Sequence, residues 1–325
     1  MDFSIVVPAY NAQEFVEDCL RSVLDQTLSA EHFEVILIDD CSQDSTWNIA
    51  SRLAKGSPNL TVAQTERNSG PGTARNIGLN KACGDWVVFV DSDDRLDHEA
   101  LSSLHRAIKS DVTDPVDAIG YDWRFLSSCP DDPGRPAEGR RDTRGLELGK
   151  ADLIRRYLSL RMDGSVIYTA VRRRVVADNH LNFRAGYHED VDFIFKVYWH
   201  ARMVRYLPHV LYHKRWRTDS IVGTVSGKHI EGFIGAWEEV GRFVAEEDAE
   251  GWGHWLPFYQ RGVAGVLATR VREIHRRSSA LGEASELYRV LHRCYQQMGV
   301  HLGGRSDRVW SRTLRRQSST NSCAL

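Results

Sequence analysis

Three aspartates follow an apolar run in the segment WVVFVDSDD, residues 86–94. Asp91, Ser92, Asp93 and Asp94 come directly after five apolar residues, which are typical of a buried strand. Close carboxylates repel one another unless a cation lies among them, and Mg²⁺ or Mn²⁺ commonly bridges one or two carboxylates to phosphates. The alternative is a solvated turn with capping aspartates. The position after a strand favours a metal site, because ligands bind off the carboxyl ends of parallel strands.

A second pair of carboxylates, Asp39 and Asp40, ends the apolar run FEVILIDD. A carboxylate at such a strand end can accept hydrogen bonds from a base N–H or from ribose hydroxyls. A capped turn is again the alternative.

A glycine-containing segment, NSGPGTARNIGL at 68–79, opens a predicted helix. Gly70 and Gly72 allow the backbone to approach a ligand closely, and Arg75 near the helix start can face phosphate. The glycine spacing is neither that of a dinucleotide-binding fingerprint nor that of a Walker loop. Taken alone, these glycines are therefore weak evidence for a ligand-binding loop.

The segment GYHEDVDF places His188, Glu189 and Asp190 in a row. General-base chemistry needs one carboxylate held near an acceptor hydroxyl. Acidic residues are also favoured at an exposed helix N-terminus by the helix dipole. The two interpretations are compatible, because a helix start can aim a base.

A basic segment, YHKRWRTDSI at 212–221, surrounds Trp216 with four cationic or titratable side chains. They are His213, Lys214, Arg215 and Arg217. Such residues can neutralise a leaving diphosphate or add a metal ligand. A solvated basic patch is the alternative.

The elements that must position these residues alternate between strand and helix in the first part of the chain. Near-continuous apolar strands separated by amphipathic helices predict a mostly parallel sheet covered on both faces. The expected strands are 3–10, 33–40, 59–66 and 85–94, and the expected helices are 14–28, 44–55, 70–83 and 98–110. Both acidic clusters then lie on the rim of one crevice. From about residue 228 the pattern becomes helical.

Composition limits the function classes. The 325 residues carry a formal net charge of −2, with 42% hydrophobic and 26% charged residues, which is typical of a soluble globular protein and gives no reason to expect a nucleic-acid partner. The six cysteines form no CxxC pair, which favours a reducing compartment. We expect no signal peptide and no transmembrane segment, and hence a cytoplasmic protein whose membrane contact, at the inner face, is at most peripheral.

Taken together and in their order along the chain, these motifs resemble those of the family 2 glycosyltransferases with a GT-A fold. The matching text is VVPAYNA at 6–12, VLDQT at 23–27, VILIDDCSQDST at 35–46, NSGPGTARNIGL at 68–79, FVDSDD at 89–94, HED at 188–190 and YHKRWRTDSI at 212–221. The resemblance covers about residues 1–222 and implies an α/β, GT-A type, mostly parallel sheet flanked by helices. It also implies transfer of a sugar from a nucleoside-diphosphate donor, with UDP as the commoner nucleotide. The expected acceptor is a hydroxyl group of a glycan, polymer, lipid carrier or small molecule.

The resemblance assigns roles to the matching positions. The implied nucleotide-sugar contacts are Pro8, Ala9, Tyr10, Asp40, Asn68, Arg75, Asp91 and Ser92. For Mn²⁺ or Mg²⁺ it implies Asp93, with Asp94 as the competing ligand in the other register and His213 as a further ligand. It makes Asp190 the general base, with Glu189 orienting it or binding the acceptor. Cys41 departs from the family, in which glycine is the commoner residue.

Two other interpretations remain open. A nucleotidyltransferase would share the sheet and the carboxylate–metal chemistry, but it would not need the HED segment. A non-catalytic sugar-nucleotide-binding protein would not need intact acids at Asp91, Asp93 and Asp190.

The region 223–325 is predicted to be a separate helical part. It is rich in arginine, so we expect a role in holding an anionic acceptor, in contacting a membrane surface or in forming a homo-oligomer. Four aromatic residues suggest that this region forms a homo-oligomer: Trp237, Phe243, Trp252 and Trp255.

Overall fold

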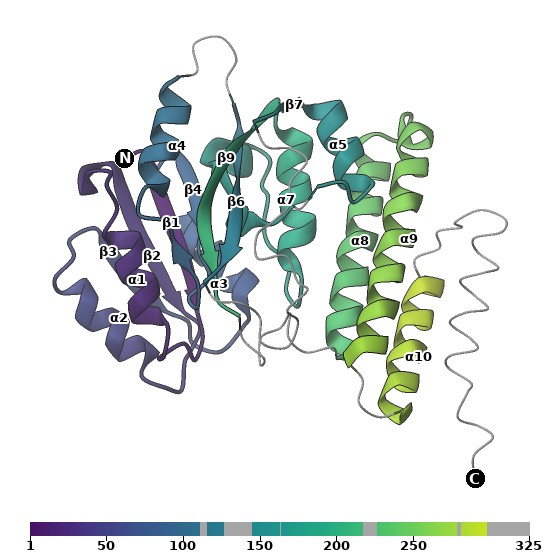
Figure 1. The fold of residues 1–325 in the computed structure, drawn as a ribbon, viewed down its shortest axis with the longest axis horizontal. Coiled ribbons are helices and arrows are strands. Elements are labelled where there is room, and N and C mark those ends of the chain that lie inside the picture. The colour runs from purple at the N-terminus through teal and green to yellow at the C-terminus, as the bar shows by residue number, and fades with distance from the viewer. Residues whose placement is uncertain (111–115, 127–144, 163, 217–225, 278–280, 298–325) are drawn as a thin grey trace. The chain divides into compact units, whose positions relative to one another are not determined.

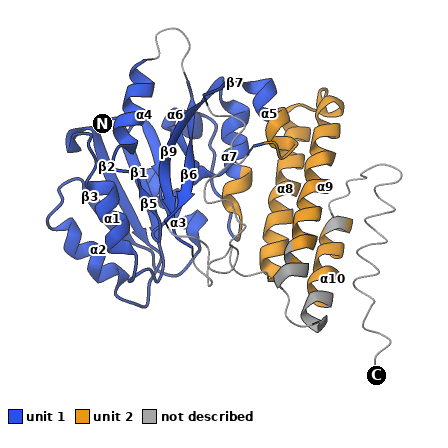
Figure 2. Cartoon of the chain, in the orientation of Figure 1, with its two compact units in different colours: residues 1–154, 162–186, 193–216 blue, residues 155–161, 187–192, 217–325 orange. Residues whose placement is uncertain are grey.

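The structure is a computed structural model that describes residues 1–110, 116–126, 145–162, 164–216, 226–277 and 281–297. The chain divides into two compact units (Figure 2). The first comprises residues 1–154, 162–186 and 193–216, and the second comprises residues 155–161, 187–192 and 217–325. The predicted helical region 223–325 thus falls in the second unit, together with two short segments from earlier in the chain.

The first unit is built on a nine-stranded sheet (Figure 1). Its strands are β1 (Phe3–Ala9), β2 (Phe33–Asp39), β3 (Leu60–Gln64), β4 (Trp86–Phe89), β5 (Arg95–Leu96), β6 (Ala118–Phe125), β7 (Glu147–Gly149), β8 (Thr169–Arg172) and β9 (Met203–Lys214). The order is β3-β2-β1-β4-β8-β6-β9-β5, with β7 paired to β9. Strands β1 to β4 are mutually parallel, whereas β5, β7 and β8 pair antiparallel with their neighbours.

Parallel pairing brings the carboxyl ends of the first strands to one edge. Ala9 of β1 lies opposite Asp39 of β2, and Asp39 lies opposite Gln64 of β3. All seven residues of β1 are buried, as expected for a strand covered on both faces. The sequence therefore predicted these four strands and their shared edge correctly.

The helices and short 3₁₀ turns connect the strands and build the second unit. They are α1 (Val16–Leu24), η1 (Ala30–His32), α2 (Thr46–Ala54), α3 (Pro71–Lys81), α4 (Ala100–Lys109), α5 (Lys150–Leu158), η2 (Val166–Tyr168), α6 (Arg173–Asp178), α7 (Glu189–His200), α8 (Gly227–Glu247), α9 (Trp252–Arg277) and α10 (Leu281–Gln297). Helix α3 packs on β1 and β2, and Gly78 allows that approach because a side chain there would collide with Val6.

Two aromatic residues that suggested a subunit interface lie inside the second unit. Trp237 is 1% exposed and its ring stacks with Tyr157 at 6.1 Å between centroids. Trp255 is also buried, and its indole N–H donates to Asp248. These side chains are hidden within one chain, so they no longer argue for an oligomer.

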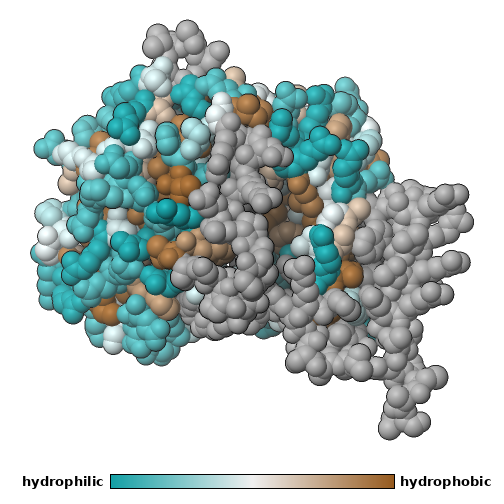
Figure 3. Space-filling view, viewed as in Figure 1, coloured by the Kyte–Doolittle hydropathy of each residue, from teal (hydrophilic) through white to brown (hydrophobic). Residues whose placement is uncertain are grey.

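Within the described part of the chain, no helix has the length and apolar character needed to cross a bilayer. On the coloured surface of Figure 3, hydrophilic residues prevail and hydrophobic residues occur in small groups between them. The arginines from Arg305 to Arg316 lie outside the described residues, so the anionic-surface hypothesis for them stays a prediction.

Candidate active site

The acidic cluster after β4 contains one carboxylate that the fold itself uses. Asp94 is 3% exposed. The Tyr212 hydroxyl donates to its Oδ2 at 2.8 Å, and the backbone N–H of Arg215 donates to its Oδ1 at 2.7 Å. Burial, reinforced by the negative charge of Asp93, raises the pKa of Asp94 to about 8. Both oxygens of Asp94 therefore serve the link between this cluster and the end of β9.

The other two carboxylates of the cluster, on Asp91 and Asp93, are partly exposed. Asp91 Oδ1 accepts from Arg75 Nη2 at 2.7 Å, and the Arg75 side chain is only 7% exposed. The Asp93 carbonyl oxygen accepts from Arg215 Nε at 3.0 Å. Partly exposed carboxylates suit Mg²⁺ or Mn²⁺, which keep several waters and take oxygen ligands. The donor set thus fits such an ion at Asp93 better than at the buried Asp94.

His213 lies in this region but has other partners. Its Nε2 lies 2.9 Å from Asp97 Oδ2, and Arg124 Nε donates to its Nδ1 at 3.1 Å. Both ring nitrogens are thus engaged, so in this arrangement His213 joins strands β5, β6 and β9. A metal-ligand role for His213 would require it to leave Asp97.

On β9, Tyr212 has a role that the sequence alone did not indicate, whereas Lys214 is one of the residues that the basic segment predicted for a diphosphate. Tyr212 bridges the cluster, because its hydroxyl also accepts from the Asp91 backbone N–H at 3.1 Å. Burial works against the charge of Lys214, but Tyr168 and Asp94 raise its pKa above the usual range. Lys214 therefore stays cationic beside the acids, where it can face a diphosphate. Residues 217–221 of the predicted basic segment lie outside the described residues.

The end of β1 offers a surface for a nucleoside. Tyr10 is 45% exposed although it follows a buried strand that ends at Pro8 and Ala9. An exposed aromatic ring at a strand end can stack on a base, since every base has a π-face. The position of Tyr10 is consistent with its predicted role.

Asp40, whose contact with the nucleotide stays a prediction, organises the glycine loop in this structure. It is 2% exposed, and its Oδ2 accepts from the backbone N–H of Gly70 at 2.6 Å and of Ser69 at 3.0 Å. Thr65 Oγ1 donates to its Oδ1 at 2.9 Å. Asn68 is exposed, and its Oδ1 accepts from Gly70 N–H at 3.2 Å. The side chains of Asp40 and Asn68 therefore hold the loop before α3, and Asn68 is exposed to solvent.

Cys41 stands where the family usually has glycine, and its backbone explains why. Its φ is +61°, in the left-handed region that costs a residue with a side chain about 1–2 kcal/mol. We expect Cys41→Gly to leave stability unchanged or to raise it by up to about 1 kcal/mol, because released strain outweighs the extra freedom of glycine when unfolded.

We expect Cys41→Val to lower stability by about 1–2 kcal/mol, because a β-branched residue tolerates this conformation worst. Urea unfolding measures both variants. Cys83→Val is the matched control, since Cys83 is exposed and has no positive φ. Equal losses at both cysteines would contradict the explanation.

The HED segment belongs to the second unit. Glu189 is buried at the start of α7, Asp190 is partly exposed, and His188 precedes them with a φ of +57°. His188 Nε2 lies 3.1 Å from His229 Nδ1 of α8, and Arg270 Nη1 of α9 lies 2.8 Å from His229 Nε2. A chain of three side chains thus ties the predicted base segment to the helices that follow it.

Helix α8 also touches the HED segment through a glycine. A methyl group at Gly232 would lie 2.7 Å from Tyr187 Cβ and 2.8 Å from the Tyr187 carbonyl oxygen. Gly235, on the same helix, has nothing within 4 Å of that position. The pair therefore separates the effect of this contact from the general preference of a helix for alanine.

We expect Gly235→Ala to stabilise the protein by about 1 kcal/mol, which is the helix propensity difference. We expect Gly232→Ala to destabilise it by about 1–3 kcal/mol, because the overlap exceeds that gain. Thermal unfolding of the two variants measures the difference. If Gly232→Ala is as stable as Gly235→Ala, Gly232 of α8 does not pack closely on the HED segment.

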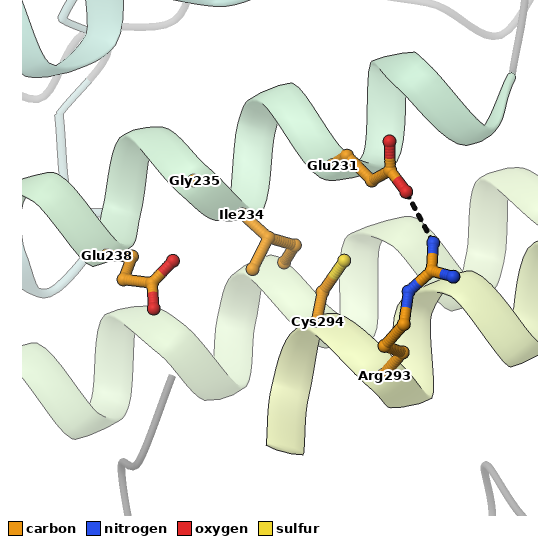
Figure 4. Close-up of a pocket in the computed structure, with 6 residues that line it drawn as sticks. All are labelled: Glu231, Ile234, Gly235, Glu238, Arg293 and Cys294. Carbon is orange, nitrogen blue, oxygen red and sulfur yellow. Dashed lines mark hydrogen bonds and ion pairs between the residues drawn. The ribbon is translucent and has the colours of Figure 1, made fainter. Parts of the chain in front are cut away.

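A shallow hollow in the second unit, between α8 and α10, carries none of the predicted site residues. Figure 4 shows its lining: Glu231, Ile234, Gly235, Glu238, Arg293 and Cys294. Arg293 and Glu231 form an ion pair across it, and burial raises the pKa of the Cys294 thiol to about 11. A thiol so far from ionisation is no nucleophile at neutral pH.

Comparison with known proteins adds three likenesses. The model of glycosyl transferase family 2 matches residues 4–157. Poly(ribitol-phosphate) beta-N-acetylglucosaminyltransferase TarS of Staphylococcus aureus is 43% identical over 102 residues, which are 31% of this chain and 18% of that protein. The uncharacterized glycosyltransferase YibD of Escherichia coli is 32% identical over 211 residues, which are 64% of this chain and 60% of that protein.

The crystal structure of S. aureus TarS 1-349 in complex with UDP-GlcNAc matches with a TM-score of 0.74 at 23% identity. The match covers 97% of this chain and 91% of that one. This likeness confirms the expected GT-A fold class with a C-terminal helical region. The chain spans less than two thirds of the length of either curated relative.

Proposed function

Because residues 4–157 belong to glycosyl transferase family 2, we propose that the protein moves a sugar from a nucleoside-diphosphate donor to an acceptor hydroxyl group. The observation that carries this proposal is the strand-end cluster. There Arg75 and Lys214 bring positive charge to Asp91, while Asp93 stays partly exposed. A site of that kind suits a diphosphate and a divalent cation, and it leaves Tyr10 available for the base.

The proposed reaction is one displacement with inversion at the anomeric carbon. Asp190 accepts the proton of the acceptor hydroxyl while the oxygen attacks the anomeric carbon from the face opposite the diphosphate. The bond from that carbon to the diphosphate oxygen breaks, and its electron pair leaves with the diphosphate. Arg75 and Lys214 stabilise the charge that develops there. Mn²⁺ or Mg²⁺ bound by Asp93 would supply further positive charge for the same group.

The buried neighbours of the base fit a positioning role. Glu189 is 5% exposed at the first position of α7, and Tyr157 donates to the carbonyl oxygen of Val191 at 2.6 Å. Such contacts hold a helix start in one orientation, and a general base must stay within hydrogen-bond reach of its proton. We assign Glu189 to orienting Asp190 or to binding the acceptor.

For the donor we propose a UDP-sugar, with UDP-GlcNAc as the first choice, because TarS is similar in fold and carries that ligand in its crystal structure. For the acceptor we propose a hydroxyl-bearing polymer, since TarS is named for poly(ribitol-phosphate). We place the protein on the cytoplasmic side of the membrane. The four described cysteines are all free, which suits a reducing compartment.

The deciding experiment screens the purified protein against nucleotide sugars by thermal shift, with and without Mn²⁺. A donor at a hundredfold excess over its Kd adds about 2.7 kcal/mol to stability, which the shift reports readily. The best donor is then incubated with acceptor polymers and the released product is identified. Release of nucleoside diphosphate supports the proposal, whereas release of pyrophosphate in a parallel reaction with a nucleoside triphosphate and a sugar 1-phosphate indicates a nucleotidyltransferase. Donor binding without transfer or hydrolysis indicates a non-catalytic binding protein.

A further inference from the structure

A second group of potential metal ligands lies at the other end of β1 from Tyr10. It consists of Asp2, His32 and His105, which come from the residue before β1, from η1 and from α4. One ligand atom of each lies within 4.8 Å of the other two. All three residues belong to the first unit, and none has a role in the proposed transfer reaction.

The two histidines face the same carboxylate oxygen. His32 Nδ1 lies 2.9 Å from Asp2 Oδ2, and His105 Nε2 lies 3.1 Å from that same atom. The imidazole rings are 5.2 Å apart between centroids. His105 Nε2 is buried and makes no hydrogen bond, although Asp2 Oδ2 lies 3.1 Å from it. A buried imidazole nitrogen without a hydrogen bond destabilises the fold unless a metal ion or another partner binds it.

The backbone holds this group in place independently of the side chains. The Asp2 N–H donates to the His32 carbonyl oxygen at 2.8 Å, and the Asp2 carbonyl oxygen accepts from the Trp86 N–H at 2.9 Å. His105 lies within α4, which fixes its Cα. The three side chains therefore converge without needing an ion to gather them.

Two imidazole nitrogens and one carboxylate oxygen form a ligand set typical of zinc. Zinc binds such atoms at about 2.0–2.2 Å in tetrahedral geometry, which places neighbouring ligand atoms about 3.3 Å apart. The 2.9 and 3.1 Å separations here differ from that by a few tenths of an ångström. Mg²⁺ and Mn²⁺ prefer sets made of oxygen atoms. We propose that Asp2, His32 and His105 bind one zinc ion, with water as the fourth ligand.

This site is separate from the one proposed for the nucleotide. Asp2 precedes β1 and Tyr10 follows it, and at 3.3 Å per residue these positions are roughly 25 Å apart. An ion at Asp2 cannot touch a donor bound near Tyr10. Its effect is to join the start of β1, the turn before β2 and helix α4, and so to stabilise the first unit.

The test uses the full-length chain without a histidine tag, stripped of metal by a chelator. Zinc is titrated in competition with a chromogenic chelator, and Co²⁺ is added separately so that its visible spectrum reports coordination by nitrogen ligands. We expect one equivalent of zinc to bind and to raise the unfolding temperature. His105→Gln should lower the zinc affinity roughly 100-fold or more, because even residues that only contact zinc ligands change metal affinity by roughly 10–100-fold.

Two matched controls locate the ion. His209→Gln, at an exposed histidine elsewhere on the first unit, should leave zinc binding unchanged. Asp93→Asn should also leave it unchanged, which separates this site from the one proposed for Mn²⁺. Metal-free unfolding of each variant is measured first, and His32→Gln replaces His105→Gln if the latter does not fold. Failure of the unaltered chain to bind zinc overturns the proposal, as does binding that survives the histidine substitution or is lost in Asp93→Asn.

Discussion

Asp190→Asn is expected to lower kcat by roughly 100- to 10,000-fold while donor binding stays within about twofold of the unaltered protein. General-base catalysis contributes that range, and an amide cannot accept the proton of the acceptor hydroxyl. Donor binding should survive because the residues proposed for it, such as Tyr10 and Arg75, belong to the first unit, whereas Asp190 belongs to the second. Steady-state kinetics measure the first effect and calorimetry with the donor measures the second.

Two controls make the Asp190 result specific. Asp178→Asn removes an exposed carboxylate at the end of α6 and should leave kcat unchanged. Glu189→Gln removes a buried neighbour and should lower kcat less than Asp190→Asn does. Normal turnover by Asp190→Asn would remove that residue from the role, and a larger loss in Glu189→Gln would transfer the role to Glu189.

The parts of the fold that depend on local pattern could be predicted from the sequence. Strands β1, β2 and β4 are near-continuous apolar runs and β3 is a shorter, more polar one, so their positions and their parallel pairing follow from length and pattern. The apolar run before Asp39 and the run before Asp91 each predicted a strand end that carries acid. Both acids lie where parallel pairing puts them, at the carboxyl ends of β2 and β4.

The partners of individual side chains could not be predicted, because they depend on distant residues. Asp40 accepts from backbone amides about thirty residues later, and no side-chain type in the sequence marks those amides. His213 bonds Asp97 only because β5 pairs with β9, and a two-residue strand such as β5 leaves almost no pattern. The link from His188 to His229 spans 41 residues and depends on how α8 packs.

The division of the chain into two units also depends on contacts between residues that are distant in the sequence. A change from alternating to helical pattern near residue 228 predicted a boundary close to 223. The structure instead groups 155–161 and 187–192 with the later helices. Tyr157 explains part of this grouping, because its ring stacks on Trp237 and its hydroxyl bonds Val191. We infer that the C-terminal helices support the HED segment, in addition to any role in acceptor binding.

Asp93→Asn is expected to remove the Mn²⁺-dependent part of donor affinity and to lower kcat/KM by roughly 100-fold or more, since a cation at a leaving diphosphate contributes several kcal/mol. Asp94→Asn is the matched substitution, because it removes the neighbouring carboxylate with the same change in shape. Burial raises the pKa of Asp94 to about 8, which favours its neutral form more than in an ordinary aspartate. An asparagine there can still accept from the Arg215 N–H through its oxygen, and the Tyr212 hydroxyl, which donates to Asp94 Oδ2, can turn to accept from the amide nitrogen.

Asp94→Asn should therefore keep the fold and keep the Mn²⁺ effect. Asp94→Ala should instead lose about 1–3 kcal/mol of stability, because it leaves the Tyr212 hydroxyl and the Arg215 N–H without their buried acceptor. Calorimetry with UDP, with and without Mn²⁺, compares the two asparagine variants, and urea unfolding compares the two Asp94 variants. If Asp94→Asn loses the Mn²⁺ effect and Asp93→Asn retains it, the buried carboxylate is the ligand, and Asp94 must exchange its bonds to Tyr212 and Arg215 for the ion on binding.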